Sequence, residues 1–274
     1  MHDRIRAKKS LGQHFLRDDG VHEEILRWTQ LEESDRILEI GAGDGTITRS
    51  LGERAGRVVA VETDRRCLAL LRKEFPPNGT VEVVEADILA FDLSSLEPMA
   101  PLKVVGDLPY NIATAVLERL LSSAGLFSLM ILMFQKEVGR RLTAEASSRE
   151  YGSLTLATAY RAEAEIIRIV PPEAFRPRPK VESALLRVVP RAAPLLPPGA
   201  EGVFTRIVRA GFSQRRKTFL NSLRGAGFSL PVETVAAALE KLSLTTKIRA
   251  EAITFEQFLR LAELLSDGAR EMRE

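Results

Sequence analysis

The feature that most constrains the fold is a glycine-rich turn that directly follows a short apolar run. The run, residues 37–40, has the Ile and Leu content of a buried parallel strand. Gly41, Gly43 and Gly45 let the chain turn tightly because they carry no Cβ atom. A helical pattern begins directly behind them, so the peptide N–H groups of its first turn face whatever lies across the glycines. The pattern predicts a strand–turn–helix unit with a ligand site at the turn.

A second apolar run, Val58–Val61, ends in Glu62. An acid about twenty residues after the glycines, at the tip of the second strand, can accept both hydroxyls of a ribose. A dinucleotide site is disfavoured, because Thr46 occupies the place of a further glycine and Asp44 adds a negative charge. A nucleoside that carries a cation tolerates this charge, and S-adenosylmethionine is such a ligand. An ordinary turn without a ligand is the alternative.

Apolar runs alternate with helical patterns in the first half of the chain, which predicts an α/β fold. We expect a Rossmann-like, mostly parallel sheet with helices on both faces, and an antiparallel edge pair formed by residues 163–170 and 181–189. Asp87 follows the third strand, at the sheet edge where such folds bind ligands. There it can accept the amine of a ligand adenine, although a capping aspartate in a loop explains it equally well.

A proline-rich segment, residues 191–200, precedes a C-terminal region with only helical patterns. We therefore predict a ligand-binding domain over residues 1–190 with a basic N-terminal segment, a linker over 191–200, and a helical domain over 201–274.

Composition excludes several classes of protein. The 274 residues contain one cysteine, so an internal disulfide is impossible and a reducing cytoplasm is expected. No apolar run is long enough to span a bilayer, and the N-terminus lacks the apolar core of a signal peptide. The three histidines and the cysteine show no metal-ligand spacing, so we predict neither a metal nor a membrane partner.

The tetrapeptide Asp107-Leu108-Pro109-Tyr110 follows the fourth expected strand and indicates the chemistry. The exocyclic amine of adenine is a poor nucleophile because its lone pair is delocalised into the ring. Asp107 and the Leu108 carbonyl can accept its two hydrogens and aim the lone pair, while Pro109 restricts the residue before it. Tyr110 can stack on the base, which is worth about 1–3 kcal/mol in single-stranded recognition. A turn that merely ends a strand is the alternative.

Basic side chains concentrate in a few segments although the formal net charge is only +2. Such clusters can bind nucleic-acid phosphates, but solvated surface patches explain them as well. The candidate RNA-binding residues are Lys8, Lys9, Arg176, Arg178, Lys180, Arg215, Arg216 and Lys217.

Five segments together resemble a known family. They are residues 8–16 (KKSLGQHFL), 38–45 (LEIGAGDG), 107–111 (DLPYN), 175–184 (FRPRPKVESA) and 212–219 (FSQRRKTF). With these segments the chain resembles the bacterial small-subunit (16S) rRNA adenine dimethyltransferases, which are class I S-adenosylmethionine-dependent methyltransferases. The resemblance runs from end to end, and it makes residues 1–190 the catalytic domain and 201–274 the rRNA-binding domain.

The resemblance implies N6,N6-dimethylation of two adjacent adenosines near the 3′ end of small-subunit rRNA, late in subunit assembly, with S-adenosylhomocysteine as product. It implies a pre-30S partner, and we expect a monomer. It implies that Phe175 holds the flipped target base opposite Tyr110. The cofactor pocket that it implies is lined by His14, Leu16, Gly41, Gly43, Glu62, Asp87 and Asp107. The family usually has asparagine where this chain has Asp107, which changes the charge beside the cofactor but keeps an acceptor oxygen.

Two other functions are compatible with parts of this pattern. One is a large-subunit rRNA adenine methyltransferase of the macrolide-resistance type, which would share the fold and the active-site loop. The other is a non-catalytic rRNA-binding assembly or transcription factor on the same fold, which would tend to lose the glycine turn or the catalytic loop. Residues 175–184 and the Arg-Arg-Lys-Thr segment favour the small-subunit enzymes.

Overall fold

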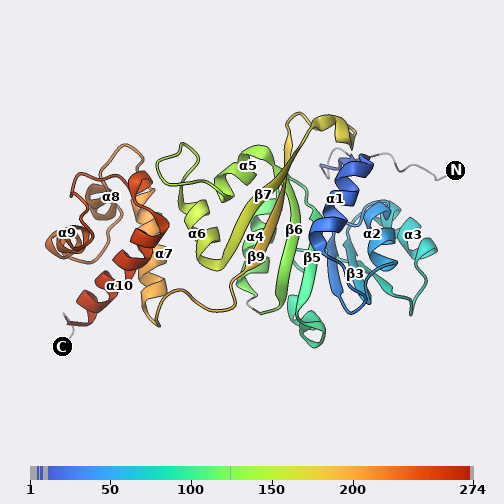
Figure 1. Cartoon of the computed structure of the whole chain (residues 1–274), viewed down its shortest axis with the longest axis horizontal. Coiled ribbons are helices and arrows are strands. Elements are labelled where there is room, and N and C mark those ends of the chain that lie inside the picture. Colours follow the sequence, from blue (N-terminus) through green and yellow to red (C-terminus); the bar gives the residue numbers. More distant parts are fainter. Residues whose placement is uncertain (1–4, 6, 9–11, 124, 272–274) are drawn as a thin grey trace. The chain divides into compact units, whose positions relative to one another are not determined.

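The computed structural model describes residues 5, 7–8, 12–123 and 125–271, and contacts divide the chain into two units. The first unit comprises Met1–Gly139 and Ala162–Ala192, and the second comprises Arg140–Arg161 and Ala193–Glu274. Figure 1 labels those of their elements for which there is room, among them β3, β5, β6, β7 and β9. This division differs from the predicted one, which placed residues 1–190 together. In the structure, residues 140–161 group with the helical unit and not with the sheet unit.

The first unit is built on a seven-stranded sheet with the order β4-β3-β2-β5-β6-β9-β7 (Figure 1). Neighbouring strands from β4 to β6 are parallel, whereas β9 is antiparallel to both β6 and β7. This confirms the expected mostly parallel sheet with an antiparallel edge pair. The strands are β2 (Arg36–Ile40), β3 (Arg57–Glu62), β4 (Val81–Glu85), β5 (Leu102–Asp107), β6 (Phe127–Gln135), β7 (Ala162–Val170) and β9 (Ser183–Pro190).

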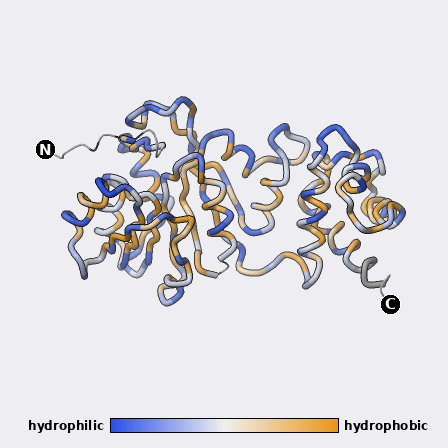
Figure 2. Tube along the Cα trace, turned by 180° about the vertical axis from the view of Figure 1, so that it is seen from behind, coloured by the Kyte–Doolittle hydropathy of each residue, from blue (hydrophilic) through white to orange (hydrophobic). Residues whose placement is uncertain are grey.

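Helices cover this sheet because its central strands are apolar on both faces. Ile37 and Leu38, which point to opposite sides of β2, are both 0% exposed. Figure 2 shows hydrophobic stretches along these strands and hydrophilic ones in many connecting loops. The helical elements of this unit are α1 (Asp19–Thr29), α2 (Thr46–Gly52), α3 (Arg65–Glu74), η2 (Leu93–Met99), α4 (Ala113–Ser122), η3 (Pro172–Ala174) and the start of α5 (Lys136–Leu142).

A separate two-stranded sheet joins the N-terminal segment to the proline-rich loop that precedes β9. Strand β1 (Phe15–Leu16) pairs antiparallel with β8 (Phe175–Arg176), and Leu16 lies opposite Phe175. The peptide N–H of Arg17 extends the pairing by donating to the Ala174 carbonyl at 2.7 Å. Two segments that are far apart in the sequence therefore lie side by side next to the carboxyl ends of the large sheet.

The second unit is helical and has its own core. Its elements are α6 (Ser153–Arg161), α7 (Ala200–Gly211), α8 (Phe219–Gly225), α9 (Val232–Lys241), η4 (Ala250–Ala252) and α10 (Phe255–Glu271). The Tyr160 ring of α6 stacks on Phe204 of α7 at 4.9 Å between centroids, and the Tyr151 hydroxyl donates to the Ile253 carbonyl at 2.9 Å. These contacts are why residues 140–161 belong to this unit. In the described part of the chain, no helix has the length and apolar character that a membrane span requires.

Candidate active site

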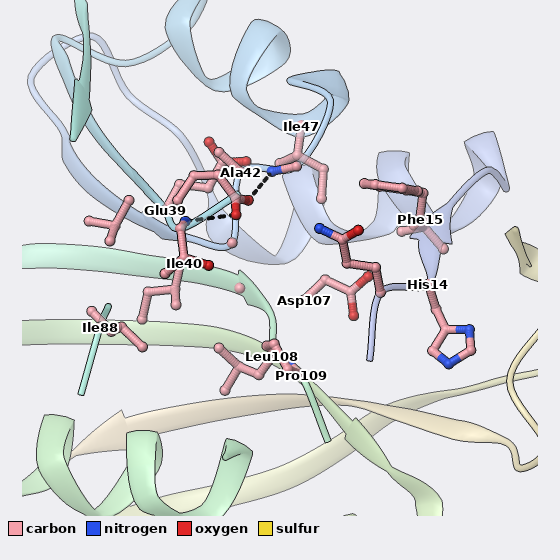
Figure 3. A pocket seen from close by; sticks show the side chains of 18 of the residues that line it. His14, Phe15, Glu39, Ile40, Ala42, Ile47, Ile88, Asp107, Leu108 and Pro109 are labelled. Carbon is pink, nitrogen blue, oxygen red and sulfur yellow. Dashed lines mark hydrogen bonds between the residues drawn. The ribbon is translucent and has the colours of Figure 1, made fainter. Parts of the chain in front are cut away.

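A pocket lies at the carboxyl ends of β2, β3, β4 and β5, where parallel sheets commonly bind ligands (Figure 3). Loops from all four strands line it, and residues 12–16 of the N-terminal segment close one side. The strands meet there because they are in register: Ile40 lies opposite both Val61 and Gly106. Their following loops therefore start at the same level.

The glycine turn takes the conformation that its sequence predicts. Gly41 and Gly43 have φ values of 76° and 57°, in the left-handed region that favours glycine, and α2 begins at Thr46. A Cβ atom on Gly43 would lie 3.3 Å from the Phe15 ring, and one on Gly41 would lie 3.4 Å from the Asp107 carbonyl. The turn is thus packed closely between the N-terminal segment and the loop after β5, and its positive φ values are what favour glycine at both positions.

Glu62 organises the pocket wall through its carboxylate. Its Oε2 atom accepts from the Gly43 N–H at 2.9 Å, and its Oε1 atom accepts from the N–H groups of Thr63 and Asp64 at 2.8 Å. A carboxylate offers about four lone-pair positions, so these bonds leave room for a ligand hydroxyl. Glu62 is 8% exposed and lines the pocket. The predicted contact with a ribose is compatible with this geometry.

Asp44 carries a charge that the protein itself compensates. Its carboxylate pairs with the Arg17 guanidinium at 2.5 Å and accepts from the Thr46 hydroxyl at 2.8 Å. The negative charge that the sequence places in the turn is therefore not free for a ligand cation. A cationic nucleoside would have to be attracted by other acids of the pocket.

Other acids do supply negative charge. Glu39, Asp87 and Asp107 line the pocket in addition to Glu62 and Asp44, whereas none of the described lining residues is lysine or arginine. Glu39 is 3% exposed, and its Oε2 atom has no hydrogen-bond partner among the described residues. Burial raises the pKa of Glu39 to about 7. A cation beside Glu39 would favour its charged form again, so the acidic lining suits a cationic ligand and disfavours a phosphate.

Asp107 ends β5 and projects toward the pocket (Figure 3). Its side chain is half-buried and forms no hydrogen bond or ion pair with the described residues. Burial raises the pKa of Asp107 to about 7. After Asp107 the chain makes a turn, in which the Ile112 N–H donates to the Pro109 carbonyl at 3.0 Å. Helix α4 then begins at Ala113. An acceptor without a partner thus lies at the position predicted for the reaction.

Tyr110 lies in the same turn, and a hydrogen bond to its hydroxyl fixes the position of its ring. That hydroxyl lies 2.6 Å from the Oγ atom of Ser183, which is completely buried in β9. The Tyr110 ring lies nearly parallel to the imidazole of His14, at 22° and 6.0 Å between centroids. Burial raises the pKa of the Tyr110 phenol, so this group remains neutral at ordinary pH.

Comparison with known proteins places this geometry in a family. A family model described as ribosomal RNA adenine dimethylase matches residues 4–267. The chain belongs to this family. Among curated relatives, the ribosomal RNA small subunit methyltransferase A of Geobacter sulfurreducens is 42% identical over 97% of this chain and 98% of its own length. The protein of that name from Synechococcus sp. (strain JA-2-3B'a(2-13)) is also 42% identical, over 96% and 94%.

Solved structures of adenine dimethylases and related enzymes show the same architecture. A dimethyladenosine transferase from Plasmodium falciparum superimposes with a TM-score of 0.76 at 25% identity, covering 90% of this chain and 96% of its own. The 23S rRNA methyltransferase ErmE superimposes with a TM-score of 0.75 at 30% identity, covering 92% and 99%. The predicted class I methyltransferase fold is thereby confirmed.

The structure separates the predicted site residues of this dimethylase into two groups. Those that line the pocket are His14, Leu16, Gly41, Gly43, Glu62, Asp87, Asp107, Leu108, Pro109 and Tyr110. Phe175 does not join them, because it is 0% exposed and packs in the core with Leu16, Ala174 and Leu185. In this structure its ring is covered, so the predicted position opposite Tyr110 in the pocket is not seen. Strand pairing with the N-terminal segment buries it, and the sequence shows no sign of that pairing.

The basic candidates lie on the surface of each unit. Lys8, Arg176, Arg178 and Lys180 are exposed in the first unit, and Arg215, Arg216 and Lys217 are exposed in the loop between α7 and α8 of the second unit. Lys9 lies outside the described residues. Arg178 pairs with Glu173 at 3.4 Å, and Arg215 donates to the Arg149 carbonyl at 2.7 Å.

Glu39 is an acid of the pocket that is absent from the sequence-based set. The sequence does contain a signal for Glu39, because this acid interrupts the otherwise apolar run of β2. A central strand that is covered on both faces rarely carries an acid without a function. Asp87 has the capping role that was considered for it, and its contact with a ligand adenine stays a prediction. Its Oδ1 atom caps the following turn by accepting from the Leu89 N–H at 2.9 Å, and it also lines the pocket.

Proposed function

We propose that this protein transfers methyl groups from S-adenosylmethionine to the N6 atoms of two adjacent adenosines near the 3′ end of small-subunit (16S) rRNA. The observation that carries the proposal is the carboxylate of Asp107, which has no partner among the described residues and lies beside Tyr110 in an acidic pocket. Membership of the adenine dimethylase family and the names of the curated relatives support the reaction and the RNA class.

The residues of the pocket fit S-adenosylmethionine. Its positive charges match the acidic lining, and Glu39 offers an unpaired buried oxygen. Glu62 would hold the ribose, Asp87 the adenine amine, and Gly41 and Gly43 allow the close approach of the backbone. The cofactor, when bound, supplies an electrophilic methyl group on a positively charged sulfur. S-adenosylhomocysteine remains as the product, and no metal is required.

The chain's own contribution is to orient the target amine. Asp107 and the Leu108 carbonyl would accept the two N6 hydrogens, and Pro109 restricts the backbone that presents this carbonyl. Tyr110 would stack on the base while Ser183 fixes its hydroxyl. No base needs to act first, because the nitrogen becomes acidic and releases its proton after methylation. Orientation and electrostatics therefore supply most of the catalysis.

The RNA would be held by the exposed basic side chains of both units, through phosphates and shape and not through a linear base code. We propose that the substrate is the pre-30S subunit late in assembly and that the enzyme acts as a cytoplasmic monomer. Among the exposed cations, Arg176 lies in β8, which pairs with the N-terminal strand β1, and Arg178 and Lys180 follow shortly after it.

The direct test is methyl transfer from labelled S-adenosylmethionine to under-methylated small ribosomal subunits, followed by nucleoside analysis. We expect N6,N6-dimethyladenosine in the small-subunit RNA. Large ribosomal subunits form the matched control, since the fold is shared with the 23S rRNA methyltransferase ErmE. Label on large-subunit RNA would replace the proposal with a resistance-type methyltransferase. RNA binding without transfer to either RNA would indicate a non-catalytic assembly factor.

A further inference from the structure

The helical unit carries a run of cations that no acid compensates. Residues 202–232 contain no aspartate or glutamate but six cations: Arg206, Arg209, Arg215, Arg216, Lys217 and Arg224. None of the six forms an ion pair with the described residues. Three other arginines of the same unit do, in the pairs Arg161–Glu201, Arg249–Glu251 and Arg260–Glu263. Positive charge is therefore left available on α7, on α8 and in the loop between them.

A backbone motif at the end of α8 fixes an aromatic ring beside this charge. The Gly227 N–H donates to the Arg224 carbonyl, and the Phe228 N–H donates to the Leu223 carbonyl, both at 3.1 Å. With a φ of 70° at Gly227, this is the Schellman motif, which ends a helix at a glycine and turns the next residue back onto it. Phe228 packs against the helical core but is only half-buried. Its ring thus has a fixed position at the surface.

Arg206 of α7 extends over this ring. Its Cζ atom lies 5.9 Å from the centroid of the Phe228 ring, within the range of a cation–π contact. The guanidinium group is planar, and it stacks on aromatic side chains and on nucleobases alike. Arg206 is exposed, so the contact with Phe228 orients its guanidinium while the residue stays accessible to a ligand.

Glycines leave room for a ligand around this pair. Gly202 lies one helical turn before Arg206, and Gly227 precedes Phe228 directly. A Cβ atom on either glycine would meet no other segment within 4 Å. A Cβ atom on Gly225, in contrast, would lie 3.0 Å from the Nε2 atom of Gln214. The surface around Phe228 is therefore continuous with the loop between α7 and α8, which carries three of the six cations.

We propose that Arg206 and Phe228 form a stacking platform for one unpaired base of the rRNA, with Arg209 and Arg224 binding the flanking phosphates. The inference rests on the proposed function and adds a base-binding site in the helical unit, apart from the pocket that holds the target adenosine. In a duplex the faces of the bases are covered by their neighbours, so a flat exposed group serves only a base that is unstacked. Every base has such a face, so the platform tolerates many sequences.

Two substitutions remove the flat groups and keep the rest. Arg206→Lys keeps the charge but loses the planar group, and Phe228→Leu keeps an apolar residue after Gly227 but loses the ring. Affinity of the full-length protein for under-methylated small subunits is measured at several salt concentrations, with melting temperatures as the folding check. We expect each variant to bind roughly fivefold or more weakly, with an unchanged salt slope. Arg260→Lys is the matched control, since this exposed arginine pairs with Glu263 at 2.6 Å.

A second readout detects the stacked nucleotide itself. The 2′-hydroxyl of an unpaired nucleotide reacts less with acylating reagents when the nucleotide is immobilised. We expect saturating wild-type protein to lower this reactivity at an unpaired nucleotide of the small-subunit rRNA outside the target adenosines. Saturating R206K should leave that nucleotide reactive and keep the other protections. A change that merely disturbed the fold would alter all protections together.

Failure of this inference differs from failure of the proposed function. Wild-type protein that neither binds nor methylates small-subunit RNA overturns both. An active wild type, with R206K binding equally well, overturns only the platform. Equal weakening in R206K and R260K overturns it too, because it shows a general preference for arginine. Weaker binding of R206K with every nucleotide still protected shows that Arg206 contacts the RNA without stacking on a base.

Discussion

The pocket of the first unit and the basic loop of the second unit (residues 212–218, between α7 and α8) carry opposite charges in opposite environments. The acids of the pocket include Glu39 and Glu62, which are 3% and 8% exposed, and Glu62 is held by three backbone N–H groups. Arg215, Arg216 and Lys217 are exposed in the basic loop. The acids of the pocket are buried at fixed positions, whereas the cations of the basic loop are exposed to solvent.

This difference separates two kinds of recognition. Buried charges are little screened and act at fixed positions, so they select one ligand of the right shape and charge. Exposed cations are screened by salt and bind phosphates with little regard to sequence. We therefore expect cofactor affinity to depend weakly on ionic strength, and RNA affinity to depend on it steeply. The following predictions test this contrast, beginning with the largest effect.

Removing the acceptor at Asp107 should have the largest effect. Asp107→Ala should lower kcat roughly 10²- to 10³-fold, as when one preorganised hydrogen-bonding group leaves a catalytic site. Asp107→Asn is the matched control because it keeps an acceptor oxygen without the charge. Methyl transfer to small subunits is the measurement, with RNA affinity as a folding check. A fully active D107A would show that the amine is oriented by other groups.

Removing the cations of the basic loop should have the next largest effect. The combined substitution of Arg215, Arg216 and Lys217 by alanine should weaken rRNA binding roughly tenfold to hundredfold and flatten its salt dependence, because each lost phosphate contact lowers the slope by about 0.7–0.9.

The control for this triple variant removes the same charge elsewhere in the helical unit, by substituting Lys241, Lys247 and Arg260 with alanine. Binding to small-subunit rRNA is measured at several salt concentrations, together with cofactor affinity. Equal losses in the two triple variants would indicate a general charge effect and no specific role for the basic loop.

The pH dependence of methyl transfer should report the charge of Asp107. Its pKa is raised to about 7 by burial, so the accepting carboxylate predominates only above that pH. We expect kcat/KM to rise about tenfold from pH 6 to pH 8 and to level off there. D107N, which does not titrate, should show a flatter profile. An identical rise in D107N would assign the titration to another group, and Glu39 is the first candidate because its pKa is also raised to about 7.

The last prediction concerns stability, and its effect on methyl transfer itself should be the smallest. The pKa of Glu39 is raised from 4.5 to about 7 in the folded protein, so the folded state binds a proton that the unfolded state has lost. Stability should therefore fall as pH rises through this range. Glu39→Gln should stabilise the cofactor-free protein by up to about 3 kcal/mol at pH 8 and leave it nearly unchanged at pH 4. Thermal melts at the two pH values measure this, and equal shifts at both would indicate a packing effect.

Local sequence determined the elements that carry the chemistry. The glycine turn follows β2 where the pattern predicts it, and Asp107 ends β5 ahead of a turn and a helix. These features depend on short-range rules, since glycine permits positive φ and an apolar run predicts a buried strand. The alternation of elements also predicts the mostly parallel sheet with its antiparallel edge pair, but it does not predict the order of the strands.

Tertiary structure decided which residues share a site and which charges they carry. Strands β1 and β8 pair although they are far apart in the sequence. This pairing buries Phe175 and brings His14 to face Tyr110. Residues 140–161 join the helical unit because their apolar side chains pack on α7 and α10. The raised pKa values of Glu39 and Asp107 come from burial by several strands and loops at once. Burial is set by contacts between distant segments, so no local pattern in the sequence contains it.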